Sequence, residues 1–359
     1  MPRAHLLSNG RYRVILTDGG GGYSAWQDVR LTRWAADPSR DVGGVWFYLR
    51  DLERGASWSA GRNPIPGNPD RYETARDGGS VAIVREECGI ESRLDVVVDP
   101  DSDCEYRILA LTNRSRTERR LDVTSFLDVT LNDPAADAAH PAFSKLFVET
   151  EFLADSKGLL ARRRPRSPDE PSLWMGHGCW LEGGAPGDVE VETDRVRFIG
   201  RGRSLTDPAA LDAGTRLSGS VGPVLDPVFS LRRTVQLAPG GTARLVTLVA
   251  ADERRDDVAR RLTAPAPRLI EAVLEAARRL ELPADPDRLS SLTGALLFGA
   301  APVATPTELP EASPLTPGDL SALGVPGNVP LVLAAVRGDA DRAELQSLSQ
   351  VVRWWRRNG

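Results

Sequence analysis

The sequence is poor in the residues that build disulfide frameworks, metal centres and cofactor sites. Three cysteines and three histidines are spread along the 359 residues: Cys88, Cys104, Cys179, His5, His140 and His177. No C-x-x-C pair and no H-E-x-x-H string occurs. We therefore expect reduced thiols, structural histidines, no metal and no cofactor.

The sequence also lacks the segments and charges that take proteins to membranes or nucleic acid. It has no apolar run of the roughly 18 residues that a transmembrane helix needs. The opening string MPRAHLLSNGRYRV has no apolar stretch typical of a secretory signal. A formal net charge of −5 provides no basic surface for nucleic acid or an anionic bilayer. We expect a cytoplasmic protein that contacts neither, and neutral polar ligands such as saccharides remain compatible.

Strings that mark nucleotide-binding and nucleophilic enzymes are absent or incomplete. The four glycines at 19–22 are not followed by Gly-Lys-Ser/Thr or by a helix pattern, so a phosphate-binding loop is not expected. No G-x-S-x-G string marks a nucleophilic serine. Asp99, Asp101 and Asp103 open like a calcium loop, but Cys104 stands where that loop needs glycine. We predict a turn there and identify no catalytic residue.

Up to about Asp252, the sequence is typical of β structure, with short apolar segments separated by Gly, Pro, Asn and Asp. The predicted strands are 11–17, 45–50, 81–86, 90–98, 105–112, 121–131, 147–153, 159–164, 173–181, 189–199, 229–237 and 243–250. Glycines in the links 155–158 and 238–241 are placed for the positive φ of hairpin turns. Strands joined so closely favour a large antiparallel sandwich over a parallel α/β sheet.

After Asp252 the pattern becomes helical. Ile270, Val273, Leu274 and Ala277 follow one another at helix spacing within a predicted helix at 267–282. Further helices are predicted at 252–262, 286–298 and 340–357, with a proline-rich tract at 300–317 and a short strand at 330–336. We therefore divide the chain into a β sandwich at 1–252, linker helices at 253–299, and a proline-rich linker, short strand and C-terminal helix at 300–359.

Aromatic and charged residues alternate between positions 23 and 51. This candidate saccharide-contact region comprises Tyr23, Trp26, Arg33, Trp34, Asp41, Trp46, Arg50 and Asp51. Flat aromatic rings stack on the apolar faces of sugar rings, and Asp and Arg bind hydroxyl groups. The alternative is that these rings fill the core of a wide sandwich.

Two tryptophans close to the end of the chain form a second candidate. Trp354 and Trp355 lie between arginines in the predicted last helix. Such rings are typical of a surface that packs against a partner. The alternative is that they dock on the chain's own sandwich.

Seven strings match a known family in order. They are HLLSNGRYRVILTDGGGGYSAWQDVRLTRWAADPSRD at 5–41, FYLRD at 47–51, LTNRS at 111–115, AADAAHPAFSKLFVETE at 135–151, RRRPRSPDEPSLW at 162–174, TDRVRFIGRGRSL at 193–205 and LDPVFSLRR at 225–233. With them the chain resembles the first supersandwich, and the helical segment after it, of cyclic β-1,2-glucan synthases. That part of the family is similar to glycoside hydrolase family 94 phosphorylases. The match departs from the family at 42–44 and at 324–330.

The resemblance implies a mainly β, galactose-mutarotase-like fold, in which a large antiparallel two-sheet supersandwich is followed by a helical extension. In the family an (α/α)6 barrel carries the catalytic acid, and another region anchors the protein in the inner membrane. No residue here matches that acid. The implied partners are β-1,2-glucan or a related oligosaccharide and a missing catalytic barrel or partner chain.

Three functions follow as hypotheses. The first is a saccharide-binding and scaffolding module of a glucan synthase or glycoside phosphorylase, inactive alone. The second is a free-standing carbohydrate-binding protein. The third is a self-sufficient glycoside hydrolase or phosphorylase, which needs two carboxylates facing each other in a pocket.

Overall fold

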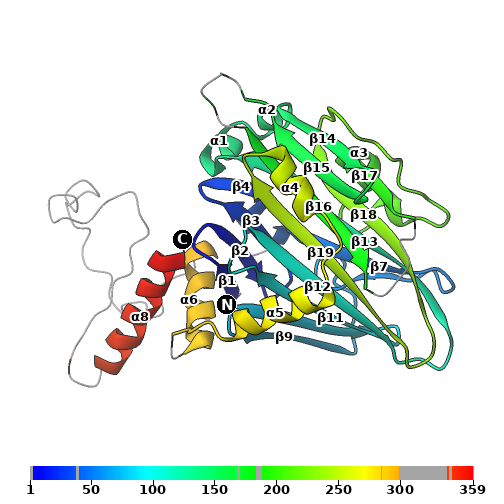
Figure 1. The fold of residues 1–359 in the computed structure, drawn as a ribbon. Coiled ribbons are helices and arrows are strands. Elements are labelled where there is room, and N and C mark those ends of the chain that lie inside the picture. The colour runs from blue at the N-terminus through cyan, green and yellow to red at the C-terminus, as the bar shows by residue number, and fades with distance from the viewer. Residues whose placement is uncertain are drawn as a thin grey trace.

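The computed structural model describes residues 3–37, 40–165, 167, 170, 172–182, 188–283, 285–298, 338 and 342–358. Two large antiparallel sheets face each other, and helices lie on their outer sides (Figure 1). The predicted proline-rich tract at 300–317 and the predicted strand at 330–336 lie outside the described residues.

The first sheet has nine strands in the order β1-β2-β3-β4-β13-β18-β17, and β7 and β8 continue from β13. Its strands are β1 (Ala4–Ser8), β2 (Tyr12–Thr17), β3 (Gly22–Trp26), β4 (Val29–Thr32), β7 (Val45–Asp51), β8 (Ser57–Ser59), β13 (Arg119–Asn132), β17 (Glu190–Asp194) and β18 (Pro227–Leu237). A separate two-stranded ribbon joins β5 (Trp34–Asp37) to β6 (Arg40–Gly43).

The second sheet has eight strands in the order β14-β15-β16-β19-β12-β11-β10-β9. These are β9 (Arg71–Asp77), β10 (Ser80–Glu87), β11 (Ile90–Val98), β12 (Cys104–Asn113), β14 (Val148–Leu153), β15 (Gly158–Arg163), β16 (Leu173–Leu181) and β19 (Thr242–Asp252). Neighbouring strands are mostly consecutive in the chain, as hairpin connections require.

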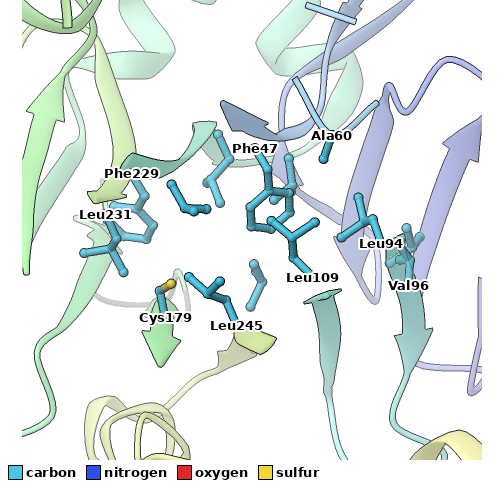
Figure 2. Packing of buried hydrophobic residues seen from close by; sticks show 14 of the residues in the cluster. Phe47, Ala60, Leu94, Val96, Leu109, Cys179, Phe229, Leu231 and Leu245 are labelled. Atoms are coloured by element: carbon cyan, nitrogen blue, oxygen red, sulfur yellow. The ribbon is translucent and has the colours of Figure 1, made fainter. Parts of the chain in front are cut away.

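The main core lies between the two sheets. Strand residues alternate between the two sides of a sheet, so each strand sends every second side chain inward. Figure 2 shows Phe47 and Phe229 of the first sheet near Leu94, Leu109 and Leu245 of the second. All five side chains are buried in one continuous cluster that joins the sheets.

Three further clusters cover the outer faces. Helices α4 (Arg255–Arg261) and α5 (Pro267–Arg278) pack on the second sheet. Helix α3 (Arg195–Ile199) and the short η1 (Ala209–Leu211) cover β7, β13 and β18 of the first sheet. Helices α6 (Pro286–Phe298) and α8 (Arg342–Asn358) pack on β1 and β2, as Figure 1 shows. Two short helices, α1 (Pro134–Ala139) and α2 (Pro141–Lys145), connect β13 to β14.

The fold class predicted from the sequence is confirmed, and three local predictions are wrong. The segment 189–199 is not one strand, because β17 ends at Asp194, whose side chain accepts a hydrogen bond from the Val196 amide and starts α3. In the link 155–158 the positive φ belongs to Lys157, at 57°, and not to Gly158. The link 238–241 does use glycine, since Gly240 has φ 72°. The predicted helix at 267–282 is shorter, because α5 ends at Arg278.

Candidate saccharide-contact region

Asp41 is the centre of the part of the predicted region that the structure brings together. Its carboxylate accepts hydrogen bonds from the Trp34 indole at 2.9 Å, from the Gly21 amide at 3.2 Å and from the Thr17 hydroxyl. A Cβ at Gly21 would overlap this carboxylate, and one at Gly19 would lie 2.8 Å from its Oδ2. The glycine run is therefore the backbone wall around Asp41, which only residues without a side chain can form.

Tyr23 and Trp34 lie together beside Asp41. Their ring centroids are 5.9 Å apart, with an angle of 36° between the planes. The Arg30 guanidinium lies 3.5 Å from the centroid of Tyr23, and Phe298 of α6 meets Trp34 edge-on at 5.7 Å. Trp34 is buried, whereas Tyr23 is half-buried. Of this pair, Tyr23 with its stacked Arg30 is the part that solvent reaches.

Trp26 and Trp46 lie in the interior instead. Trp26 belongs to the core between the sheets, and its indole Nε1 donates to Asp103 at 2.8 Å. Trp46 is 2% exposed and packs in the cluster of Phe126 and Phe198 on the outer side of the first sheet. Neither ring has an open face for a sugar, which is the core arrangement that the sequence left as the alternative.

Arg33 and Asp51 are occupied by ion pairs. Arg33 donates to Asp137 of α1 through two nitrogens, at 3.1 and 2.7 Å. Asp51 has no exposed surface and accepts from Arg119 Nε at 2.7 Å. Bidentate pairs of this kind fix neighbouring elements. These two residues hold the loops and strands around the region, away from the Tyr23 surface.

Arg50 differs from its neighbours because it lines a pocket of about 370 Å³ on the outer side of the first sheet. The wall of this Arg50 pocket consists of Arg50, Gly55, Ser57, Ile65, Thr206, Asp207, Leu211, Asp212 and Ala213. The segment that contains Ile65 also reaches the Asp41 wall, since the Asn63 amide donates to the Gly19 carbonyl at 3.1 Å. Residues 206–213 were missed from the sequence, because nothing local relates them to Arg50.

A second pocket, of about 410 Å³, lies at the β14 edge of the second sheet. Cross-strand pairing places Glu149, Arg162 and Trp174 side by side across β14, β15 and β16. Arg162 pairs with Glu149 at 2.7 Å, and Glu151 pairs with Arg255 of α4. Each charged group of this second pocket is thus paired, Glu149 with Arg162 inside the pocket and Glu151 with a residue outside its wall. The sequence gave no reason to single it out.

The terminal tryptophans contact the chain's own helices and strands. Trp354 is 7% exposed, clusters with Leu6 and Leu289, and has the Arg76 guanidinium 5.3 Å from its ring. The Trp355 indole donates to the Thr293 hydroxyl of α6 at 3.1 Å. Docking on the sandwich, the alternative that the sequence left open, describes their placement. Only Trp355 retains partial exposure.

An exposed apolar patch lies elsewhere, where α2, α3 and the loop before β18 meet. It consists of Phe143, Leu146, Val196, Val221 and Leu225, of which Leu225 is 78% exposed. Lys145 pairs with Asp226 at 2.6 Å, and the Arg195 amide donates to the Asp226 carbonyl at 3.0 Å. These contacts join α2, α3 and the loop before β18 at Asp226, and we call the exposed apolar residues of the three segments the apolar patch.

A Ser–His–Asp arrangement that the sequence did not indicate joins β1 to α6. His5 Nε2 lies 2.8 Å from Asp18 Oδ1, and His5 Nδ1 lies 3.0 Å from Ser290 Oγ. Both His5 and Ser290 are buried, and the serine hydroxyl also donates to the Pro286 carbonyl at 3.0 Å. Burial lowers the pKa of His5, an effect that Asp18 partly opposes. Because His5 and Ser290 are both buried, the described contacts of this arrangement are those that fasten α6 to β1.

Carboxyl groups with a raised pKa are the usual general acids of glycoside chemistry. Burial raises the pKa of Asp99 and of Asp128. Asp99 accepts from backbone amides in its turn, and Asp128 pairs with Arg195 at 2.9 Å. Neither lines the Arg50 pocket or the second pocket. Among the described residues, no group of three potential metal ligands gathers either.

The two antiparallel sheets, their shared core and the helices on their outer faces define an antiparallel β supersandwich. The chain belongs to the family described as glycosyl hydrolase 94, supersandwich domain, whose model matches residues 1–265. Within the part of the chain that the structure describes, none of the helices is both long and apolar enough to cross a bilayer.

The relatives are carbohydrate enzymes. The chain is 35% identical over 255 residues to the cyclic beta-(1,2)-glucan synthase NdvB of Rhizobium meliloti (strain 1021). This match covers 71% of this chain and 9% of that protein. It is 27% identical to the solabiose phosphorylase of Paenibacillus borealis, over 62% of this chain and 28% of that enzyme. The chain thus spans less than a third of the length of these curated relatives.

Among solved structures, a bacterial glucoamylase in complex with acarbose matches with a TM-score of 0.49 and 8% identity, over 76% of this chain and 36% of that one. A putative aldose 1-epimerase of Escherichia coli K12 matches with a TM-score of 0.39 and 10% identity, over 70% of this chain and 99% of that one. The fold assignment rests on the two sheets and on the family match.

Proposed function

We propose that this chain is the saccharide-contacting and scaffolding supersandwich module of a cyclic β-1,2-glucan synthase or a related glycoside phosphorylase. The observation that carries the proposal is the supersandwich match over residues 1–265, together with relatives that are a glucan synthase and phosphorylases. Because the chain spans 9% and 28% of two of these relatives, we assign catalysis to a barrel or partner chain and not to this segment.

The electrostatics of Asp212 in the Arg50 pocket support a module that binds without turning over its ligand. Protonation of a glycosidic oxygen needs a carboxyl group of raised pKa in contact with the substrate. Asp212 of the Arg50 pocket instead has a pKa lowered by its hydrogen bond from Arg203. The self-sufficient enzyme is therefore our least favoured hypothesis.

The apolar patch of Phe143, Leu146, Val196, Val221 and Leu225 supports a docking role. Exposed apolar groups with charged neighbours are typical of surfaces that a partner covers. We assign the contact with the catalytic barrel to this patch and to the partly exposed Trp355. As further parts of the proposal, the protein works in the cytoplasm, and 1–252, 253–299 and 300–359 are its sandwich, linker-helix and C-terminal segments.

A free-standing carbohydrate-binding protein is the second candidate. One observation favours it: Trp354 is buried and Trp355 bonds to Thr293, so the last helix needs no partner to cover these rings.

Calorimetry and a product assay on one sample test the proposed activity. Linear β-1,2-linked glucose oligosaccharides are titrated into the chain, and the mixture is then incubated with phosphate and assayed for glucose 1-phosphate. We expect binding heat without product. Product formation would refute the non-catalytic role. Absence of binding heat would refute the saccharide contact but not the scaffolding role.

A chimera separates the module from the free-standing protein. The chain replaces the matching segment of the Paenibacillus borealis phosphorylase, and phosphorolysis is measured with and without Leu225→Asp. If the chain is such a module, the chimera should be active in phosphorolysis. Leu225→Asp should lower this activity because it buries a carboxylate at the contact with the barrel. Leu269→Asp, at a 45% exposed leucine of α5 on the second sheet, is the matched control. An inactive but folded chimera favours the free-standing protein.

A further inference from the structure

Strand β7 presents three successive outward side chains to the segment that covers the first sheet. Trp46 and Tyr48 pack against Phe198 in the outer cluster, and the Tyr48 hydroxyl donates to the Leu205 carbonyl at 2.9 Å. Arg50 follows at the next outward position, where its Nη1 donates to the Asp212 carbonyl at 2.8 Å. Because side chains alternate along the strand, Arg50 lies on the same outer side as Tyr48 and contacts the segment 205–212 that covers it.

Arg50 is a largely buried cation that forms no direct ion pair, and the nearest charge acting on it from the pocket wall is that of Asp212. It is 7% exposed, and no carboxylate of a described residue forms an ion pair with it. Other arginines buried to a similar extent are paired: Arg119 with Asp51, and Arg107 with Glu105 at 3.1 Å. A guanidinium nitrogen that is both buried and unpaired is costly, and no nitrogen of Arg50 is in that state, so those without a hydrogen bond face the accessible space of the pocket. The remaining N–H groups of Arg50 are therefore available to a ligand in the pocket that it lines.

The rest of the pocket wall selects the chemistry of that occupant. Ser57 and Thr206 contribute hydroxyl groups, and Ile65 and Leu211 contribute apolar surface. The carboxylates of Asp207 and Asp212 pair with Arg203 at 2.7 and 2.6 Å. An anion would meet these two carboxylates, whereas a sugar ring offers hydroxyls that both donate and accept, and C–H faces for the apolar wall.

The size of the pocket agrees with this chemistry. Its volume of about 370 Å³ is at the lower end of the roughly 300–1,000 Å³ typical of small-molecule sites. Such a pocket suits one sugar residue, with the rest of the chain leaving through the open side.

We propose that the Arg50 pocket binds a single residue of a neutral saccharide, with Arg50 and Ser57 donating to its hydroxyls and Asp207 or Asp212 accepting from them. The inference rests on the proposed function for the identity of the saccharide. It deepens that function by moving the binding site from the Tyr23–Trp34 rings to the outer side of β7.

The test compares variants by calorimetry with a β-1,2-linked glucose trisaccharide, and with glucuronate and inorganic phosphate as anionic probes. Arg50→Ala should weaken binding of the trisaccharide at least tenfold, and Ser57→Ala two- to fivefold. Because Arg50→Ala removes a buried side chain, a second variant leaves it intact: Ala213→Trp at the exposed rim should block the pocket with a similar loss. Arg162→Ala, the same change in the second pocket, should alter affinity less than twofold.

Each outcome decides the inference. Trisaccharide affinity that is unchanged in both Arg50→Ala and Ala213→Trp overturns the pocket assignment alone and leaves the proposed function standing. No binding by the unsubstituted protein overturns both the pocket and the saccharide contact. Tighter binding of phosphate or glucuronate than of the trisaccharide, lost in Arg50→Ala, overturns the neutral ligand.

Discussion

The two sheets bury their outer faces in different ways. The second sheet is sealed by α4, by Leu262 directly after it and by α5, and their apolar side chains, such as Val258 and Ile270, pack on apolar strand residues. The first sheet is covered over β7, β13 and β18 mainly by irregular segments, and several charged groups are buried beneath them. These groups include Arg50, Asp122, Asp128 and Arg232.

This difference distinguishes the outer face of the second sheet, which is structural, from the outer face of the first sheet, which has polar groups that a ligand could bind. An apolar face under amphipathic helices gains free energy by excluding water and has no polar group left to offer. Charged groups under a loop cost free energy unless they are satisfied, and they are retained where they serve a ligand or a network. Asp122 accepts from Thr234 at 2.7 Å and Arg232 donates to Thr124 at 3.0 Å, which leaves Arg50 as the member turned to a pocket.

Leu262→Ala tests the structural face and should have the largest effect. The Leu262 side chain is fully buried above Gly158 and Gly176, which have no side chains to refill the space. We expect the free energy of unfolding to fall by about 2–5 kcal/mol, measured by urea denaturation. Leu269→Ala, at a 45% exposed leucine of α5, should cost below about 0.5 kcal/mol. Saccharide affinity should be unchanged, and a folded Leu262→Ala protein that binds less would contradict the contrast between the faces.

His177 provides a test of the interior between the two sheets. Burial lowers its pKa to about 4, and it joins the sheets by a 2.8 Å hydrogen bond between its Nε2 and Ser125 Oγ. As pH falls from about 6.5 towards 4, the unfolded chain binds a proton that the folded chain excludes, so stability falls, by about 3 kcal/mol.

Unfolding by urea at pH 7, 5.5 and 4 measures the effect of His177. His177→Gln should be less stable at pH 7 yet lose this part of the pH dependence. Parallel pH curves for the two proteins would show that the histidine titrates normally in the folded state.

Regular alternation made most strands predictable, and its absence explains those that were missed. β11 (Ile90–Val98) and β16 (Leu173–Leu181) have the predicted bounds because apolar residues mark their inner sides. β9 (Arg71–Asp77) was missed, since it has no buried residue and is held by pairing with β10. The start of α3 had a local signal in Asp194, but the apolar residues after it favoured a strand.

The candidate region was predictable only in part, because its partners are distant in the chain. Asp41 and Gly21 are 20 positions apart, and only the folded ribbon of β5 and β6 shows why the glycine is needed. Arg50 and Asp212 are 162 positions apart. Residue type identified Arg50 as a candidate, but burial decided that Trp26 and Trp46 lie in the core while Arg50 lines a pocket.

Gly21→Ala tests the Asp41 wall with a smaller effect. The new methyl group would overlap the carboxylate, so Asp41 must move and lose its bonds to Trp34 and Thr17. We expect a loss of about 1–3 kcal/mol in unfolding free energy. In an Asp41→Ala background the same glycine change should cost below about 0.5 kcal/mol. Equal costs in both backgrounds would mean that the strain lies elsewhere in the turn.

Arg162→Ala, on the second sheet, should have the smallest effect of the four. Its side chain is 46% exposed and pairs with that of Glu149, which is 25% exposed. Exposed ion pairs contribute about 0–1 kcal/mol, so thermal unfolding should shift little. Because Arg162 and Arg50 are the same residue type in pockets on opposite sheets, equal losses of saccharide affinity in the two alanine variants would erase the distinction between the faces. A loss confined to Arg50→Ala would mean that burial without a direct ion pair, and not the presence of an arginine in a pocket, marks the binding face.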